Sequence, residues 1–266
     1  TAITDMFKYA IATGRRLRGT LVLISYKAVG GEGQKAVPAA VAVELIHKSS
    51  LIHDDIIDES DVRRNRKAFH AVYGENRGVI MGDLVCAQAF ESLKPLEKDF
   101  DDSTVLECYR ILADALNAIY EGQYMDLAFE GGFYGDETEF LKMLKLKSAR
   151  LIESSAEVGA TLGGGRLEEV KALASYARNL AIAFQIQNDV NNIVGVEKRL
   201  GIKKAADLYQ RKCSIPILYS LSHTEEAKRE RILSILATEK PSSKEVSGLV
   251  GILQNSGSID YARRYV

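Results

Sequence analysis

The sequence lacks tryptophan and contains little proline. It contains 4 prolines in 266 residues and no tryptophan, whereas proline makes up about 5% of an average protein. Proline interrupts helices because it lacks the backbone N–H and clashes with the preceding turn. Its scarcity therefore favours a helical fold.

Cysteine is scarce as well. The three cysteines, Cys86, Cys108 and Cys213, are odd in number and far apart. This pattern excludes a disulfide framework and a Cys-x-x-Cys metal site. We therefore expect a cytoplasmic protein of the reducing cytosol.

The sequence also has no large excess of positive or negative charge. The 35 Lys and Arg residues against 36 Asp and Glu residues give a formal net charge of −1. Charge alone supplies no attraction to nucleic acid or to an anionic membrane, so we expect no nucleic-acid partner, and any basic site must be local. The sequence has neither an uncharged apolar run of about 18 residues nor a signal peptide, so we expect no membrane span.

What the sequence does contain is helical periodicity. Apolar residues recur at three- and four-residue spacings from Ala36 to Asp58. Further segments of this kind cover roughly residues 79–95, 103–130, 137–162, 167–193, 205–222 and 225–238. The sequence predicts one all-α domain over residues 1–266, with about ten helices. Because the chain begins with Thr1 rather than Met and stops at Val266, we expect its ends to be trimmed.

Three carboxylates follow the apolar segment that begins at Ala36. On a helix, Asp54, Asp55 and Asp58 share one edge, where like charges repel unless a cation is present. Three oxygen ligands without His or Cys suit Mg²⁺, which often bridges carboxylates to phosphate oxygens. The alternative is an ordinary charged helix end that continues into the acidic turn at residues 58–61.

Two basic clusters favour the metal interpretation. Residues 63–67, Arg-Arg-Asn-Arg-Lys, follow the carboxylates directly, and arginine matches the geometry of phosphate oxygens. Residues 14–19, Gly-Arg-Arg-Leu-Arg-Gly, open an earlier helix, whose N-terminus favours an anion. His47 lies on the same helical stripe as Asp54, about 10 Å away. Carboxylates for a metal beside arginines for phosphate predict a diphosphate–metal site.

These motifs, taken in order, resemble those of the trans-isoprenyl diphosphate synthases, or polyprenyl synthetases. The matches run from about residue 14 to residue 220. They comprise Gly14–Arg18, Glu44–His47, the DDxxD motif Asp54–Asp58, Arg63–Arg64, His70, Gly82–Asp83, Gly122–Asp126, Lys147–Ala149, Phe184–Asp189, and Asp207–Leu208 before Lys212.

The resemblance implies an all-α isoprenoid synthase fold, with helices around a deep central cavity, and a homodimer. It implies a head-to-tail condensation of isopentenyl diphosphate with an allylic prenyl diphosphate, in which Mg²⁺, as two or three ions, assists departure of the allylic diphosphate. The substrates must be aligned and charge held in a dry pocket, so binding and electrostatics dominate the catalysis.

The resemblance also implies the role of each matching residue. Asp54, Asp55 and Asp58 would be metal ligands, joined on the other side by Asn188 and Asp189. The allylic diphosphate would be held by Arg63, Lys147, Gln185, Lys203 and Lys212. Isopentenyl diphosphate would be held by Arg15, Arg18, His47 and Arg64.

The sequence departs from the family most clearly in the second acidic motif. Where the family has DDxxD, residues 188–192 read Asn-Asp-Val-Asn-Asn. An Asn carbonyl still binds a hard cation, but without charge, so we expect a weaker hold on the metal. Smaller departures are Arg15 for Lys, Gly19 for Pro and Ser148 for Thr. The segment 201–207 aligns only loosely with the family pattern, and we choose Lys203 rather than Lys204 as the matching residue.

Two serines bear on the length of the product. Ser49 and Ser50 precede Asp54 by about one helical turn, where the growing hydrocarbon should run. Small side chains leave room there, which predicts a product of C20 or longer. Alternatively, the serines only pack against a neighbouring helix.

Two other functions fit part of the pattern. A terpene cyclase or a head-to-head condensing enzyme also uses DDxxD, but the cyclase motif Asn-Asp-x-x-Ser-x-x-x-Glu fails at Asn192 and Val196. A cyclase also needs no second anion site. A regulatory subunit that depends on an active partner would explain the weakened second motif, but not the intact first one.

Overall fold

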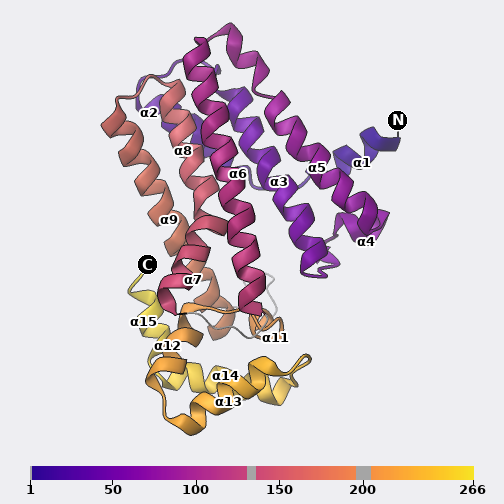
Figure 1. The fold of residues 1–266 in the computed structure, drawn as a ribbon, viewed down its shortest axis with the longest axis vertical. Coiled ribbons are helices and arrows are strands. Elements are labelled where there is room, and N and C mark those ends of the chain that lie inside the picture. The colour runs from indigo at the N-terminus through magenta and orange to yellow at the C-terminus, as the bar shows by residue number, and fades with distance from the viewer. Residues whose placement is uncertain (1, 131–135, 196–204) are drawn as a thin grey trace. The chain divides into compact units, whose positions relative to one another are not determined.

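The computed structural model describes residues 2–130, 136–195 and 205–266, and helices dominate these ranges (Figure 1). The predicted all-α fold class is confirmed. None of the helices in the described ranges combines the length and the apolar character needed to cross a membrane.

Packing divides the chain into two compact units. The first unit comprises Thr1–Ile119 and Arg150–Ala177, and the second comprises Tyr120–Ala149 and Arg178–Val266. The described elements of the first unit are α1 (Ala2–Ile11), α2 (Leu17–Ala28), α3 (Val37–Ile57), β1 (Val62–Arg63), β2 (Arg66–Lys67), α4 (Phe69–Tyr73), α5 (Glu75–Glu91), η1 (Lys94–Lys98) and α8 (Arg150–Leu162). Helices α6 (Asp102–Glu130) and α9 (Leu167–Val194) contribute residues to both units.

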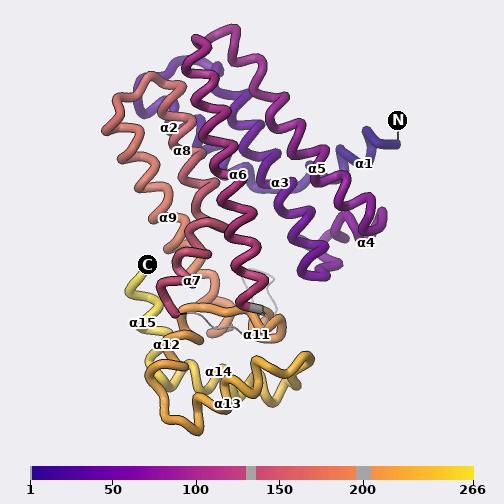
Figure 2. The backbone as a smooth tube through the Cα atoms, in the orientation of Figure 1, coloured from indigo at the N-terminus to yellow at the C-terminus, as the bar shows by residue number. Residues whose placement is uncertain are grey.

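Helix α3 is central to the first unit. It packs along α5 and α2, and α2 packs along α8, as the ribbon and the tube both show (Figures 1 and 2). Helices α2 and α8 approach closely because Gly159 has no side chain: a Cβ there would lie 2.2 Å from the carbonyl oxygen of Val22. Fully buried side chains such as Ile46, Leu93 and Leu112 fill the core, and each contributes about 1.5–3 kcal/mol by burial. Together these contacts fix the direction of α3.

A short hairpin follows α3 and was not predicted. Strands β1 and β2 pair antiparallel, with Val62 opposite Lys67 and Arg63 opposite Arg66. The two turn residues, Arg64 and Asn65, have φ angles of 54° and 60°, the left-handed values that a tight two-residue hairpin turn requires. Strands of two residues are too short to show an alternating pattern, so the sequence gives no signal for them.

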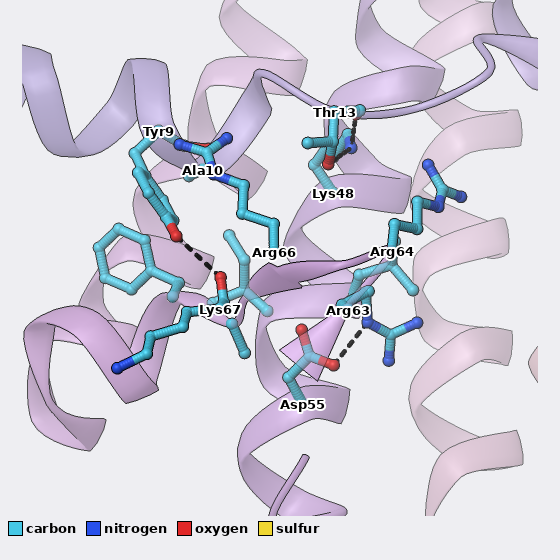
Figure 3. Close-up of a pocket in the computed structure, with 13 residues that line it drawn as sticks. Tyr9, Ala10, Thr13, Lys48, Asp55, Arg63, Arg64, Arg66 and Lys67 are labelled. Atoms are coloured by element: carbon cyan, nitrogen blue, oxygen red, sulfur yellow. Dashed lines mark hydrogen bonds and ion pairs between the residues drawn. The ribbon is translucent and has the colours of Figure 1, made fainter. Parts of the chain in front are cut away.

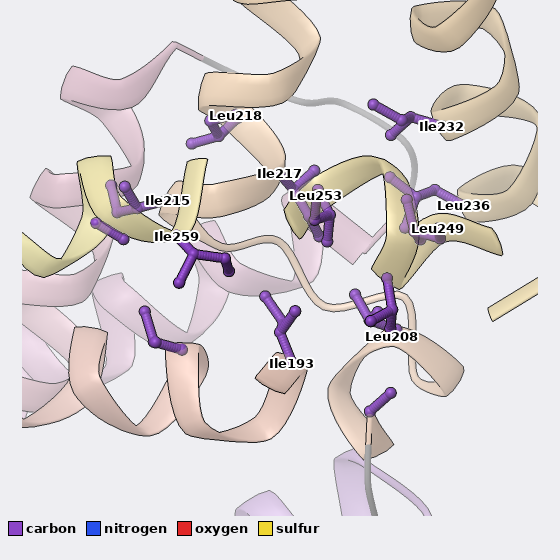
Figure 4. Packing of buried hydrophobic residues seen from close by; sticks show 14 of the residues in the cluster. Ile193, Leu208, Ile215, Ile217, Leu218, Ile232, Leu236, Leu249, Leu253 and Ile259 are labelled. Atoms are coloured by element: carbon purple, nitrogen blue, oxygen red, sulfur yellow. The ribbon is translucent and has the colours of Figure 1, made fainter. Parts of the chain in front are cut away.

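The second unit has its own apolar core. Its described elements are α7 (Glu137–Leu144), the π-helical turn η2 (Lys145–Ala149), α11 (Ala206–Tyr209), α12 (Ile215–His223), α13 (Glu226–Ala237), α14 (Ser243–Asn255) and α15 (Ser258–Arg263). Figure 4 shows Ile193 of α9 and Leu208 of α11 packed with residues of α12 and α14 such as Ile217 and Leu249. This core holds the short α11 in place although it is only four residues long.

Helix boundaries differ from the expectation in two places that matter for function. The segment 137–162 is interrupted by the π-turn η2, and the segment 205–222 is divided into α11 and α12. The second interruption follows from the backbone, since Arg211 has a φ angle of 58°, which ends the helical geometry. The periodicity also missed the helices α1, α4, α14 and α15, of which α4 and α15 are too short for a periodic signal.

Three of the four prolines stand at the starts of helices. Pro38, Pro95 and Pro216 occupy the first or second position of α3, η1 and α12. A missing N–H costs nothing there, because the first N–H groups of a helix have no partner within the helix. The scarce prolines therefore support the helical fold rather than interrupt it.

Candidate functional site

The predicted site residues fall into two groups, one in each compact unit, and each group is described by itself. The first unit carries the acidic motif, the two basic clusters, His47 and the two serines. The second unit carries Lys147, Gln185, Asn188, Asp189 and Lys212. Lys203 lies outside the described residues.

The carboxylates of the first unit stand at the C-terminal end of α3. Asp54 and Asp55 are in its last turn, and Asp58 is its C-cap, whose N–H donates to the carbonyl of Asp54 at 2.8 Å. The C-terminus of a helix carries partial negative charge, so three carboxylates there repel one another and the helix dipole. Asp55 is moreover buried, at 5% exposure, and burial raises its pKa. The arrangement calls for a cation.

Arg63 supplies a positive charge at this end of α3. From strand β1, its Nη2 lies 3.0 Å from Oδ2 of Asp54. Its Nε lies 2.5 Å from Oδ1 of Asp55 (Figure 3). The guanidinium partly opposes the rise in the pKa of Asp55. In the described residues, no three His, Cys, Asp or Glu side chains are gathered as a metal site; two of the three motif carboxylates are paired with Arg63 instead.

A cationic pocket lies beside the carboxylates, between α1, α3 and the hairpin. Its wall includes the cations Lys48, Arg63, Arg64, Arg66 and Lys67, together with the carboxylate of Asp55 (Figure 3). Such a density of positive charge in one pocket is typical of an anion site.

Aromatic contacts tie α1 to the hairpin at the edge of this pocket. The guanidinium of Arg66 stacks on the ring of Tyr9, 3.4 Å from its centroid, and the hydroxyl of Tyr9 donates to the carbonyl of Lys67 at 2.8 Å. The stacking is a cation–π interaction, which stabilises such a contact further when it is shielded from water. Helix α1, which the sequence analysis missed, therefore forms one wall of the pocket.

The second basic cluster contributes one half-buried and two exposed arginines. Burial, with the neighbouring Arg64, lowers the pKa of Arg18 to about 10, although Glu44 opposes the shift. The buried Nε of Arg18 has no hydrogen-bond partner among the described residues. Arg15 is exposed, and Arg16 donates from Nη2 to the carbonyl of Ile11 at 2.9 Å. Of the three, Arg18 is the least exposed to solvent.

His47 lies among these cations. Burial and then the charges of Arg18, Lys48 and Arg64 lower its pKa well below the usual value. His47 is therefore neutral at physiological pH and offers a ring N–H without adding charge.

One departure from the family pattern has a structural explanation. The backbone N–H of Gly19 donates to Oε1 of Glu44 at 2.9 Å. A proline at position 19 has no N–H and would leave this buried carboxylate oxygen without that donor. Gly19 therefore binds α2 to α3 in a way that the usual Pro cannot.

The two serines lie on α3. Ser49 is buried at 1% exposure, and its Oγ has no hydrogen-bond partner among the described residues. Ser50 is half-buried and donates to the carbonyl of His47 at 3.0 Å. Ser49 therefore lies in the interior of the first unit, whereas Ser50 is partly open.

In the second unit, Lys147 lies on the π-turn η2 and forms an ion pair with Asp126 of α6. The turn packs directly on α6: a Cβ at Gly122 would lie 2.3 Å from the backbone nitrogen of Lys147. Gly122 thus sets the position of the lysine backbone.

Asp189 is the carboxylate of the second acidic motif and is buried at 8% exposure. It accepts a hydrogen bond from Nε2 of Gln185 at 3.0 Å. Burial and the nearby carboxylates of Asp207 and Asp126 raise the pKa of Asp189 to about 8, while Gln185 and Lys212 oppose the shift. The structure therefore brings Gln185, Asp189 and Lys212 together.

Asp126 and Asp207 are residues of this group that the sequence analysis did not assign. Both lie inside motifs that it quoted, so the signal was present, but neither belongs to a DDxxD pattern. Their influence on the pKa of Asp189 makes them neighbours of that side chain.

Asn192, one of the amides in the second motif, has a structural role. Its Oδ1 accepts from the N–H of Asp207 at 3.3 Å, and its backbone carbonyl accepts from the N–H of Ala205 at 3.0 Å. Asn192 therefore holds the start of α11. Asn188 is half-buried on α9, one residue before Asp189.

Comparisons with known proteins agree with the geometry. Residues 1–253 match the family described as polyprenyl synthetase. The chain is 36% identical over 252 residues to the short chain isoprenyl diphosphate synthase of Methanocaldococcus jannaschii, covering 95% of this chain and 75% of that one. It is 32% identical over 262 residues to the geranylgeranyl diphosphate synthase of Saccharolobus solfataricus, covering 97% and 79%. The crystal structure of geranylgeranyl pyrophosphate synthetase from Pyrococcus horikoshii superimposes with a TM-score of 0.92 at 34% identity, covering 98% of this chain and 79% of that chain.

Proposed function

This chain belongs to the polyprenyl synthetase family, and we propose that it condenses isopentenyl diphosphate with an allylic prenyl diphosphate, head to tail, to give an all-trans prenyl diphosphate. The chain is a prenyltransferase. The observation that carries the proposal is the pairing on α3 of two opposite sites: the carboxylates at its end, and a cationic pocket around Lys48 and Arg64. A metal-assisted reaction of two diphosphates needs both.

The acidic end of α3 fits a magnesium ion. Asp54, Asp55 and Asp58 offer only hard oxygen donors, and the guanidinium of Arg63 already stands against two of them as a cation. In the second unit, Asp189 and the amide of Asn188 are the proposed ligands, so two or three ions in total are part of the proposal. When bound, Mg²⁺ would neutralise diphosphate charge and assist departure of the leaving group.

The allylic diphosphate is assigned to Arg63, Lys147, Gln185 and Lys212, with Lys203 outside the described residues. Arg63 changes partners in this proposal: it releases the carboxylates when they take a metal and turns to phosphate oxygens, which its planar fork matches. Lys147 and Gln185 are likewise held by carboxylates, Asp126 and Asp189.

Isopentenyl diphosphate is assigned to Arg64, which lines the cationic pocket, and to three residues outside the wall of that pocket. Arg18 and Arg64 provide charge, and neutral His47 provides a hydrogen-bond donor. Arg15, exposed on the loop before α2, is a fourth proposed contact. A pocket that gathers this many cations is stabilised when a diphosphate enters it.

Few protein groups take part directly in breaking or forming covalent bonds in this reaction. The allylic C–O bond breaks and its electron pair leaves with the diphosphate. The double bond of isopentenyl diphosphate then attacks the allylic cation and forms the new C–C bond, and one proton is lost to the released diphosphate. The side chains align the two substrates and hold separated charge away from water.

The product is proposed to be C20 or longer. Ser49 and Ser50 are small side chains one turn before the carboxylates, where a growing tail would extend. Ser50, which is partly open and not fully packed, is the better candidate of the two.

We further propose a homodimer in the cytoplasm. Two consecutive exposed apolar side chains of α5, Val79 at 44% and Ile80 at 65%, support a covering partner. The three cysteines are free thiols, which suits a reducing compartment. Size-exclusion chromatography with light scattering measures the mass, and a monomer would contradict the dimer.

A catalytically weakened subunit of a heteromeric synthase remains a second candidate because Asn188 replaces a carboxylate in the second motif. A class I terpene cyclase is disfavoured by the cationic pocket, which a reaction of one diphosphate does not need.

One experiment separates these functions. The purified chain, without other proteins, is incubated with Mg²⁺, labelled isopentenyl diphosphate and allylic primers of several lengths. A synthase incorporates label into longer prenyl diphosphates, and incorporation disappears with EDTA and in the variant Asp54→Asn. No product from the chain alone favours the subunit, and a hydrocarbon released from the allylic primer alone favours the cyclase.

A further inference from the structure

Lys48 is a buried lysine that belongs to none of the motifs described above. It lies on α3, next to His47, with 3% of its surface exposed. Its ammonium donates to the carbonyl of Thr13, on the loop between α1 and α2, and the hydroxyl of Thr13 lies 3.5 Å away. The ammonium is thus bound to a neutral oxygen, although a buried charge is normally paired with an opposite charge.

The charges around Lys48 are mostly positive. A Cβ built on Gly14 would lie 3.1 Å from Nζ of Lys48 and 3.3 Å from Nη1 of Arg64, so the two cations converge on the same glycine. Gly14 has a φ angle of 137°, a backbone conformation that favours glycine. Because Gly14 has no side chain, Lys48 and Arg64 both approach the loop closely.

The titration of Lys48 reflects the same environment. Burial, followed by the charges of Arg64 and Arg16, lowers the pKa of Lys48 to about 8, and Glu44 of α3 opposes the shift. Arg63 from the hairpin adds to the lowering. Repulsion between cations in a partly dry pocket costs free energy, which an anion between them would recover.

We propose that Lys48 is a further substrate-binding residue, whose ammonium contacts the diphosphate of isopentenyl diphosphate together with Arg64. The inference rests on the proposed function, because it assigns Lys48 to that reaction's second substrate. An ammonium has three donors, so one stays on the carbonyl of Thr13 and fixes the loop while the others reach phosphate oxygens. Lys48 thus binds the anion and positions Gly14 beside it.

The first test replaces the charge. Lys48→Gln should raise KM for isopentenyl diphosphate by about 10-fold or more, the usual effect of losing a charge-assisted hydrogen bond. KM for the allylic substrate should change less than about 2-fold, and the melting temperature should not fall, since a buried unpaired cation has been removed. Lys27→Gln, at an exposed lysine of α2, is the matched control and should change neither constant.

The second test uses pH, which a merely structural role would not affect. In the unmodified chain, KM for isopentenyl diphosphate should rise between about pH 7 and pH 9, as Lys48 loses its proton. In Lys48→Arg, whose charge persists, that part of the rise should disappear. The facing arginines stay charged and His47 stays neutral over this range, so they do not mimic the effect.

Results that overturn the assignment of Lys48 can be distinguished from results that overturn the proposed function. If the unmodified chain forms no prenyl diphosphate, calorimetric titration with isopentenyl diphosphate still compares its affinity with that of Lys48→Gln. An equal affinity, or equal KM values in an active enzyme, would overturn the assignment. Equal increases in both KM values with a lower melting temperature would also overturn it, because they indicate a damaged fold.

Discussion

Nε of Arg63 lies 2.5 Å from Oδ1 of Asp55, so the first basic residue after the acidic motif neutralises that motif directly. The same guanidinium reaches Oδ2 of Asp54 at 3.0 Å. The motif is thus stabilised by the chain itself when no other cation is bound, and the ion pairs are only partly exposed.

Removing Arg63 should therefore destabilise the metal-free protein. Arg63→Gln leaves two carboxylates without their cation, and we expect the free energy of unfolding to fall by about 1–3 kcal/mol. Urea denaturation with and without Mg²⁺ measures this, and Mg²⁺ should recover most of the loss. Arg110→Gln, which breaks an exposed ion pair with Glu107, should cost less than about 0.5 kcal/mol. Similar losses in both variants would refute a special role for Arg63.

Restoring a carboxylate in the second motif should strengthen the hold on the metal. Asn188→Asp is expected to lower the Mg²⁺ concentration for half-maximal activity, because a charged oxygen replaces a neutral one beside Asp189. Asn191→Asp is the control, since the Oδ1 of Asn191 accepts from Gln187 at 2.8 Å and belongs to a different pair. An unchanged or higher requirement in Asn188→Asp would show that residue 188 does not bind the ion.

A large side chain at position 50 should shorten the product. Ser50→Phe is expected to shift the product towards fewer carbons, because the ring would block the path beyond the carboxylates. Chromatography of the dephosphorylated products measures their lengths, with Ser50→Ala as the control that keeps the side chain small. The same product distribution in both variants would leave Ser50 with a packing role only.

A methyl group at Gly122 should displace Lys147. The Cβ of Gly122→Ala would meet the backbone nitrogen of Lys147 at 2.3 Å, and overpacking of this kind costs about 1–3 kcal/mol. We expect a lower melting temperature and a rise in KM for the allylic substrate. Gly248→Ala, on α14 with open space around it, should be neutral or stabilise by up to about 1 kcal/mol. A stable, fully active Gly122→Ala would contradict the close packing.

The periodicity of the sequence was sufficient to predict the long helices. Long amphipathic helices such as α3 and α9 have many turns, and each turn adds to the periodic signal. The hairpin at residues 62–67 and the short helix α4 do not repeat, and tertiary packing decides their conformation. The interruption at Arg211 depends on one backbone angle, which no composition or periodicity encodes.

The candidate site also has residues that the sequence predicts and residues that only the structure reveals. The acidic motif and the arginines were predictable because their chemistry is concentrated in short segments. Lys48 was not, because a lysine on a helix is usually solvated, and only the structure places it against Thr13 and Gly14. Asp207 owes its influence on Asp189 to the fold, since 18 positions separate them in the sequence.

In the hairpin that follows α3, the side chains of two consecutive arginines lie near different groups. Arg63 ends a strand and faces the carboxylates, whereas Arg64 begins the turn and reaches towards Gly14. Because Arg63 lies in strand β1 and Arg64 lies in the turn, a slip of a single residue would change the surroundings of both side chains. In the proposed reaction, lengthening the segment between Asp58 and Arg63 by one residue would therefore disturb the proposed contacts to both substrates without removing any charged group.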